Sequence, residues 1–398
     1  MFRKFRTNFE MISNDTNNSL NIETQLIASL LVKSSVSKQL QTIAEKILHN
    51  ERISCDDALV LYEKADLNFV GMLANYVKTQ KFGNQVFFNK NIHIEPSNVC
   101  VHKCKFCSYY REKDDRESWE YSIDEIAAKL KTIPADALTE VHIVGGCHPS
   151  RTIAYYCDLL RLVKQILPHV YIKAFTAVEI EYMAKLNSMT ICEVLTKLKE
   201  SGLDAMPGGG AEIFDEKLRE EICPSKTKSN DWLAIHKQAH QLGIETNATI
   251  LYGHKETFAH RIDHLNRLRT LQDETHGFNA FIPLKYKKEN NVLGIERELP
   301  WTEDLKNFSI TRLFLDNIPH LKVYWPMLGK DFSQITLDYG VDDFDGTIND
   351  STKIYSMAGS VEKTPIITQD EMITLIKDSG KTPVERDTLY NIIAIHNK

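Results

Sequence analysis

Three cysteines lie close together in the segment NVCVHKCKFCSYYR, at positions Cys100, Cys104 and Cys107. Their spacing, Cys-x3-Cys-x2-Cys, places three thiols on one short loop. Thiolates are the usual ligands of iron-sulfur clusters, and cubic clusters normally take four of them. Because no fourth cysteine lies nearby in the sequence, the pattern predicts a [4Fe-4S] cluster with three protein ligands and one open iron that can bind a small molecule.

A zinc site is the sharper alternative to a cluster. Zinc accepts three cysteines and one histidine, and His102 lies between the first two cysteines. Zinc ribbons, however, usually bring pairs of ligands from two separate knuckles, and the chain has no second Cys-x-x-Cys. A zinc-stabilised binding protein therefore stays open as a different class of function, and three buried structural cysteines that happen to cluster are the other, less favoured alternative.

The elements that must position this loop follow from the pattern after Gly83, where short apolar runs alternate with amphipathic stretches. Strict alternation of strands and helices predicts parallel strands with crossover helices, and eight repeats can close as an α/β fold of the (β/α)8, TIM-like barrel type. A doubly wound open sheet is the structural alternative. The eight strand candidates are 86–95, 140–146, 170–179, 203–209, 244–253, 278–286, 320–328 and 341–347.

Three regions are expected along the chain. Residues 1–84 form an N-terminal tail, polar to about residue 20, and a helical extension with apolar residues at helical spacing from Glu23 to about Gln80. Residues 85–350 form the barrel. Residues 351–398 form a C-terminal segment with a helix in QDEMITLIKDSG, which we expect to pack on the barrel.

Chemistry in such barrels belongs to the loops at the carboxyl ends of the strands. The cysteine loop follows the first strand candidate, Gly145 and Gly146 end the second, and the run GGGAE with Glu212 follows the fourth. Polar side chains near other strand ends are candidates to bind an acidic substrate or move protons, namely His142, His148, Lys173, Asn247, His254 and Lys285. Each of them singly is more often a structural residue.

The cysteine spacing, with the aromatic Phe106 directly before the third cysteine, resembles the signature of the radical S-adenosylmethionine superfamily. The resemblance implies that Phe106 lies near the adenine of S-adenosylmethionine and that Gly145 and Gly146 bind its amino group. Cys147 stands where an acidic residue is usual, which puts that one position in doubt. We expect Glu212 to accept hydrogen bonds from the ribose hydroxyls, although glycine runs usually only allow tight turns.

Longer segments resemble the aminofutalosine synthases of the futalosine route to menaquinone, among them VHIVGGCHP, IKAFTAVEI, GLDAMPGGGAEIF, TNATILYGHKET and PVERDTLY. Such enzymes consume S-adenosylmethionine as a co-substrate. The resemblance implies that the adenosyl radical adds to 3-[(1-carboxyvinyl)oxy]benzoate, with rearrangement and decarboxylation, to give 6-amino-6-deoxyfutalosine. The cyclic dehypoxanthinylfutalosine synthases of the same pathway and one subunit of the F420 chromophore synthase share parts of these segments and are the alternatives.

The catalytic residues that we expect are His254, Lys285 and His142, because each lies near the end of a strand candidate. Cofactor contacts are expected from Phe106, Gly145, Gly146 and Glu212. The reaction also needs an electron donor such as flavodoxin or ferredoxin.

The charge and hydrophobicity of the sequence argue against nucleic acids and membranes as binding partners. Lys and Arg number 48 against 54 Asp and Glu, so the net charge of -6 offers no electrostatic footprint for nucleic acid or for anionic membranes. The first 20 residues lack the apolar run of a signal peptide, and no stretch is long and apolar enough for a membrane span. We therefore expect a cytoplasmic enzyme in which the eight cysteines are reduced or bind metal.

Overall fold

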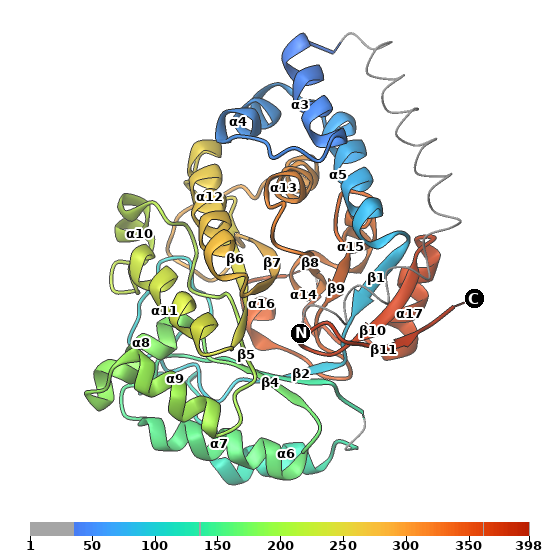
Figure 1. Ribbon diagram of the computed structural model, residues 1–398. Helices are drawn as coiled ribbons and strands as arrows, with labels where there is room; N and C mark the ends of the chain where they lie inside the picture. Colours follow the sequence, from blue (N-terminus) through green and yellow to red (C-terminus); the bar gives the residue numbers. More distant parts are fainter. Residues whose placement is uncertain (1–35, 135–136, 361, 398) are drawn as a thin grey trace.

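The computed structural model describes residues 36–134, 137–360 and 362–397. Eight consecutive parallel strands form its centre, each hydrogen-bonded to the next in chain order (Figure 1). They are β2 (Asn91–Ile94), β3 (Glu140–Ile143), β4 (Tyr171–Ala174), β5 (Ala205–Met206), β6 (Glu245–Tyr252), β7 (Phe278–Lys285), β8 (His320–Tyr324) and β9 (Asp343–Asp345). This curled parallel sheet with helices around it confirms the barrel-like fold class.

The two ends of the curled sheet meet through a narrow contact. Asn91 of β2 forms a parallel bridge with Thr347, directly after β9, and the Ile348 amide donates to the Asn91 carbonyl at 2.9 Å. Apart from this contact, β2 has β3 as its only ladder neighbour among the described strands. The barrel is therefore closed by a single bridge instead of a full ladder.

The crossover helices cover the outside of the sheet (Figure 1). Their starts are set locally, because side chains such as Ser122, Thr176 and Thr190 cap the first turns with a glutamate three residues later. These helices are α6 (Ile123–Lys131), α7 (Ile153–Ile166), α8 (Ala177–Asn187), α9 (Ile191–Glu200), α10 (Glu216–Ile222), α11 (Ser229–Gln241), α12 (Phe258–Thr275), α13 (Trp301–Phe314), α14 (Trp325–Leu328) and α15 (Lys330–Thr336).

The first strand candidate, 86–95, is two strands. β1 (Gln85–Phe88) pairs with β10 (Thr382–Arg386) and β9, whereas β2 pairs with β3. β11 (Ile392–Ile395) then joins β10 in antiparallel orientation. The C-terminal region thus contributes α16 (Lys353–Met357), the expected helix α17 (Gln369–Asp378) and two strands that the sequence analysis did not identify.

The N-terminal helices lie beside the last crossover helices. α5 (Leu67–Phe82) packs along α13, and α4 (Cys55–Lys64) contacts α12 and α13. α3 (Lys38–Leu48) packs on both α4 and α5. The expected tail and the first part of the helical extension, up to residue 35, lie outside the described residues. Among the described helices, none combines the length and apolar character that a membrane span requires.

Candidate active site

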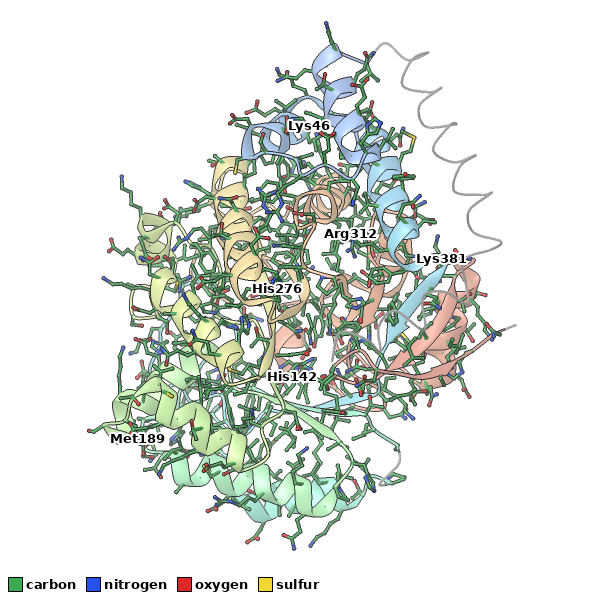
Figure 2. The ribbon with its side chains drawn as sticks, viewed as in Figure 1. Lys46, His142, Met189, His276, Arg312 and Lys381 are labelled. Carbon is green, nitrogen blue, oxygen red and sulfur yellow. The ribbon has the colours of Figure 1, made fainter. Side chains whose placement is uncertain are left out.

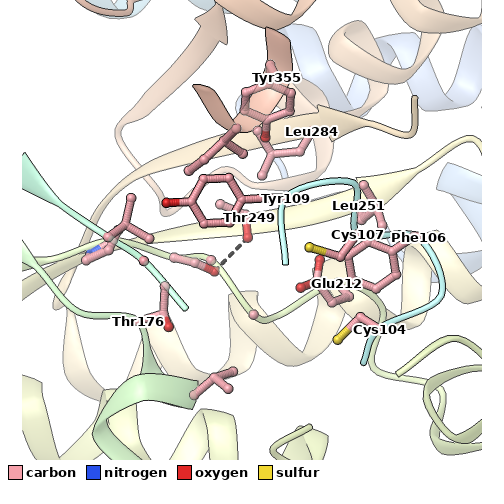
Figure 3. A pocket seen from close by; sticks show the side chains of 18 of the residues that line it. Cys104, Phe106, Cys107, Tyr109, Thr176, Glu212, Thr249, Leu251, Leu284 and Tyr355 are labelled. Atoms are coloured by element: carbon pink, nitrogen blue, oxygen red, sulfur yellow. Dashed lines mark hydrogen bonds between the residues drawn. The ribbon is translucent and has the colours of Figure 1, made fainter. Parts of the chain in front are cut away.

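One pocket opens at the carboxyl ends of the barrel strands, and all three cysteines of the signature line it. Phe106 and Glu212 lie with Cys104 and Cys107 at one side of this pocket, while Tyr355 and Leu284 border another side (Figure 3). Gly145, Gly146 and Gly208 also line it. The structure therefore brings together the cysteine loop, the glycine pair and the GGGAE run, as the sequence predicted.

The cysteine loop is fixed by backbone hydrogen bonds to neighbouring segments. The Cys100 amide donates to the Arg111 carbonyl at 3.1 Å, and the Lys105 amide donates to the Ile222 carbonyl at 2.8 Å. The Cys107 amide turns back to the Cys104 carbonyl at 3.0 Å. These bonds satisfy the buried backbone of a segment without regular structure and hold the three thiols toward the pocket.

The glycine pair is required by close approach of this loop. A Cβ atom on Gly146 would lie 2.2 Å from the Val99 carbonyl oxygen and 3.0 Å from Cys100 Cβ. On Gly145 it would lie 2.8 Å from the Ser97 carbonyl oxygen, which accepts from the Gly146 amide at 2.8 Å. Only glycine leaves room for these contacts, so the pair positions the cysteine loop whatever else it binds.

Two further thiols adjoin the signature cysteines. Hydrogen bonding from Cys147 lowers the pKa of Cys100 to about 6, against a desolvation effect that would raise it. Cys104 is hydrogen-bonded with Cys223, and this contact together with burial raises the pKa of Cys104 well above its usual value. All eight cysteines are free thiols. The expected acidic position beside the glycine pair is thus occupied by a thiol that contacts a signature cysteine.

Lys226 is a pocket residue that the sequence analysis missed. Its ammonium pairs with the Glu212 carboxylate and lies 5.3 Å from the centre of the Phe106 ring. Burial opposes its charge, but Glu212, Cys104 and Cys223 raise the pKa of Lys226 well above its usual value. A fixed cation among thiols favours their deprotonated, metal-binding form. Its position, in a loop after a short helix, gave no signal in the sequence.

Glu179 lies in the first turn of α8, and not at the end of a strand as the run 170–179 suggested. Its carboxylate accepts from the Thr176 amide at 2.7 Å and from the Gly145 amide at 3.3 Å. Burial raises the pKa of Glu179 to about 7, despite these hydrogen bonds. The pocket therefore has a carboxylate beside the glycine pair, supplied by the next strand-helix unit.

Of the candidate polar residues, four line the pocket: His142, Lys173, Asn247 and Lys285. His254 does not, since its side chain is fully buried with Nε2 3.0 Å from the Leu251 carbonyl. His148 also lies outside the lining and places Nε2 2.7 Å from Glu120.

Lys285 is paired within the protein. Its Nζ atom lies 2.6 Å from Asp304 Oδ2, and the other oxygen of that carboxylate accepts from Tyr252 at 3.0 Å. Burial raises the pKa of Asp304, although Lys285 opposes this shift. Lys285 therefore reaches the pocket as one member of a buried ion pair.

The arrangement of the thiols suits a cluster better than a single ion. Within the described ranges, no group of three His, Cys, Asp or Glu side chains is placed to hold one metal ion. His102 directs Nδ1 to within 3.2 Å of Ser225 Oγ. A zinc ion bound by three cysteines and His102 does not fit this geometry, whereas a cubic cluster takes each thiolate on a different iron.

Two family models match the chain. The radical SAM superfamily model matches residues 94–268, which include the signature cysteines and the strands up to β6. The model of the CofH/MqnC C-terminal region matches residues 275–398. Together these matches cover the chain from the end of β2 to residue 398, apart from residues 269–274.

Curated relatives extend over almost the whole chain. An aminodeoxyfutalosine synthase of Thermus thermophilus is 44% identical, over 90% of this chain and 97% of the relative. Another from Streptomyces coelicolor is 40% identical, over 88% of this chain and 93% of the relative. A cyclic dehypoxanthine futalosine synthase of Streptomyces coelicolor is 34% identical, over 90% of both chains.

Solved structures share the fold at low sequence identity. Methylornithine synthase (PylB) superposes with a TM-score of 0.67 at 19% identity, covering 86% of this chain and 97% of that one. The hydrogenase maturase HydG of Carboxydothermus hydrogenoformans has a TM-score of 0.70 at 14% identity, covering 94% and 85%. These likenesses concern the fold alone.

Proposed function

The chain belongs to the aminodeoxyfutalosine synthase family of radical S-adenosylmethionine enzymes, and from this premise we propose how its pocket serves the reaction of that family. The reaction joins the adenosyl group of S-adenosylmethionine to 3-[(1-carboxyvinyl)oxy]benzoate and gives 6-amino-6-deoxyfutalosine. The observation that carries the proposal is the pocket lined by Cys100, Cys104 and Cys107, in a chain 44% identical to such a synthase.

Cys100, Cys104 and Cys107 would hold the [4Fe-4S] cluster, which supplies the electron that cleaves S-adenosylmethionine to the adenosyl radical. Lys226 favours the thiolate forms that the metal requires. The hydrogen bond from Cys147 gives Cys100 a lower pKa than an ordinary thiol. Cys100 is thus the thiol that loses its proton most readily, while Lys226 opposes the raised pKa values of Cys104 and Cys107.

S-adenosylmethionine would lie between the glycine pair and the GGGAE run. Phe106 offers an aromatic face for the adenine, and Glu212 offers a carboxylate for the ribose hydroxyls. Gly145 and Gly146 present backbone to the methionine end, beside the Glu179 carboxylate. The pairing with Lys226 fixes the orientation of the Glu212 carboxylate, whose oxygens are hydrogen-bond acceptors.

The acceptor substrate carries two carboxylates and reacts through radicals, so its site needs cationic or donor groups and protection from water. His142 and Lys285 are our candidates for these contacts, and both line the pocket. His254, the third candidate, does not reach the pocket. It would contribute only by stabilising the loop after β6, through its contact with the Leu251 carbonyl. We further propose flavodoxin or ferredoxin as electron donor and the cytoplasm as location.

The test uses anaerobically reconstituted protein with a strong reductant, S-adenosylmethionine and the enolpyruvyl benzoate. We expect a product that retains the adenine and the aryl group, detected by mass spectrometry. Formation of 5'-deoxyadenosine without any such adduct would rule out the synthase reaction and favour the cyclase of the same pathway. Colourless protein containing one zinc ion would contradict the cluster itself.

A further inference from the structure

The inner end of the pocket contains polar atoms that have no partner in the protein. They belong to His93, His142, Tyr324 and Asn247, all of which line the pocket: both ring nitrogens of His93, Nε2 of His142, the Tyr324 hydroxyl and Oδ1 of Asn247 are buried without a hydrogen bond. Buried polar groups are costly unless they are hydrogen-bonded, and four of them around one space indicate a polar ligand.

These side chains form one layer of the barrel interior. His93, His142 and Lys173 are register partners on the adjacent strands β2, β3 and β4. The His93 ring lies 4.5 Å from the His142 ring and 6.3 Å from the Tyr324 ring, measured between centres. Figure 2 labels His142, which lies inside the molecule near β2 and β4.

The layer is separate from the cysteine end of the pocket. His142 precedes Gly145 by three residues along β3, which is about 10 Å of extended chain. The inner end therefore lies toward the middle of the barrel, while the signature cysteines lie at its mouth.

Three of the unpartnered side chains at the inner end can donate a hydrogen bond, whereas Oδ1 of Asn247 can only accept one. A neutral imidazole carries one N–H, so His93 and His142 each offer one proton. Burial lowers the pKa of His93 to about 4 and that of His142 well below its usual value, so both are neutral at pH 7. Burial also raises the pKa of Tyr324, which keeps its hydroxyl as a donor. Lys173 adds an ammonium that already pairs with Glu140 at 2.7 Å.

Most of the fixed charges around this layer are paired. Lys173 pairs with Glu140, Lys322 lies 3.3 Å from Asp345, and Arg386 lies 2.6 Å from Asp343. Asp350 accepts from the His93 amide at 3.2 Å and pairs with Lys129. Glu95, which acts on Tyr324, is a further carboxylate: burial raises its pKa, and it accepts from the Thr352 hydroxyl at 2.5 Å and from the Lys353 amide at 3.1 Å.

We propose that the inner end of the pocket binds the ring carboxylate of the benzoate substrate, with His93, His142 and Tyr324 donating hydrogen bonds to it. This inference rests on the proposed function. The double bond that reacts must face the cysteine end, and the enolpyruvyl carboxylate is attached directly to it. The ring carboxylate lies on the far side of the molecule, so it is the acidic group that reaches the inner layer.

The experiment compares Tyr324→Phe and His142→Phe with the wild type, each reconstituted with its cluster. Two substrates are used, the enolpyruvyl benzoate and the phenyl analogue that lacks the ring carboxylate. Loss of one charge-assisted hydrogen bond should raise KM for the benzoate about tenfold to a hundredfold. KM for the phenyl analogue should change less than about threefold, and His142→Gln, which keeps a donor, should recover part of the loss.

Tyr62→Phe is the matched control. It removes another buried hydroxyl, that of Tyr62 on α4, which donates to Asn307 on α13, and it should leave both KM values unchanged. Equal losses on the two substrates would overturn the subsite. If the wild type binds the benzoate without turning it over, and Tyr324→Phe weakens that binding, the proposed reaction fails but the subsite stands.

Discussion

Single residues at the mouth of the pocket are arranged around the needs of a thiolate-bound cluster. Cys100 has its pKa lowered to about 6 by the Cys147 contact, and Lys226 supplies a cation next to the thiols. Cys104 and Cys107 have raised pKa values, mainly through the Cys223 contact for the first and burial for the second. Binding of metal must therefore displace protons from two of the three ligands.

Replacing any one of Cys100, Cys104 and Cys107 by Ala should remove a cluster ligand. We expect iron content to fall from about four per chain to less than one, and formation of the adenosylated product to drop at least a hundredfold. Cys157→Ala is the control, because Cys157 lies on α7 away from the pocket and should keep both values near wild type. Normal iron content in all three variants would refute the assignment.

Lys285→Met should destabilise the fold of the protein. It leaves Asp304 buried without its cation, which typically destabilises a protein by about 3–5 kcal/mol. Adding Asp304→Asn should restore most of this loss, because the remaining pair is neutral. Thermal unfolding of the single and double variants measures the effect, and a double variant as unstable as Lys285→Met would show that the ion pair is not the cause.

At the scale of elements, the glycine pair after β3 and the cysteine loop after β2 form one unit. The loop passes so close to Gly146 that a methyl group would meet the Val99 carbonyl at 2.2 Å. The position of the three signature thiols thus depends on a neighbouring strand that carries none of them.

Gly146→Ala should therefore reduce cluster binding more than it reduces the stability of the fold. We expect reconstituted iron to fall at least threefold, because the loop must shift by more than its hydrogen bonds allow. Gly71→Ala on α5, which would bring a Cβ to 2.6 Å from the Tyr339 ring, is the control. It should lower the melting temperature and leave iron per folded protein unchanged. Iron loss equal in both variants would contradict a specific role for Gly146.

The sequence predicted the strands and helices well where the pattern is local. The alternation of apolar runs and amphipathic stretches indicated β2 to β9 and that helices connect them, since each element depends on nearby residues. It merged β1 with β2, because the turn at Asn89 and Lys90 interrupts the apolar run only briefly. It also missed β10 and β11, whose partners lie about 300 residues away or at the chain end.

The site was predictable in the same uneven way. Cys100, Cys104 and Cys107 were found because their spacing within eight residues has chemical meaning. Lys226 and His93 were missed, since only the folded chain shows which distant residues share their space. His93 did leave a signal, a polar side chain within the buried strand NIHI.

At the scale of the whole molecule, ion pairs are buried at the base of the barrel, and some histidines are buried in their neutral form. Arg386 comes from β10 near the C-terminus and pairs with Asp343 of β9, so the terminal segment completes the base of the barrel. Burial lowers the pKa of His93 to about 4 and of His264 to about 3. Both residues charge more readily in the unfolded chain than in the folded one.

This arrangement predicts loss of stability in mild acid. Between pH 6.5 and about 4 these histidines bind protons in the unfolded chain but stay neutral in the folded protein. The free energy of unfolding therefore decreases as the pH falls. Each such histidine contributes a slope approaching about 1.4 kcal/mol per pH unit. Denaturant unfolding at pH 7, 6 and 5 measures the slope, and His264→Gln should reduce it. A stability that is flat over this range would contradict the neutral burial of these histidines.

The central claim is that the adenosyl group becomes part of the product. The most direct measurement supplies S-adenosylmethionine with carbon-13 at the 5' position of its ribose, together with the enolpyruvyl benzoate, to the reduced, cluster-loaded protein. The account predicts a product in which the labelled carbon is bonded to the carbon that was the vinyl CH2, visible as a one-bond carbon coupling when that carbon is labelled too. Recovery of the label only in 5'-deoxyadenosine would contradict it.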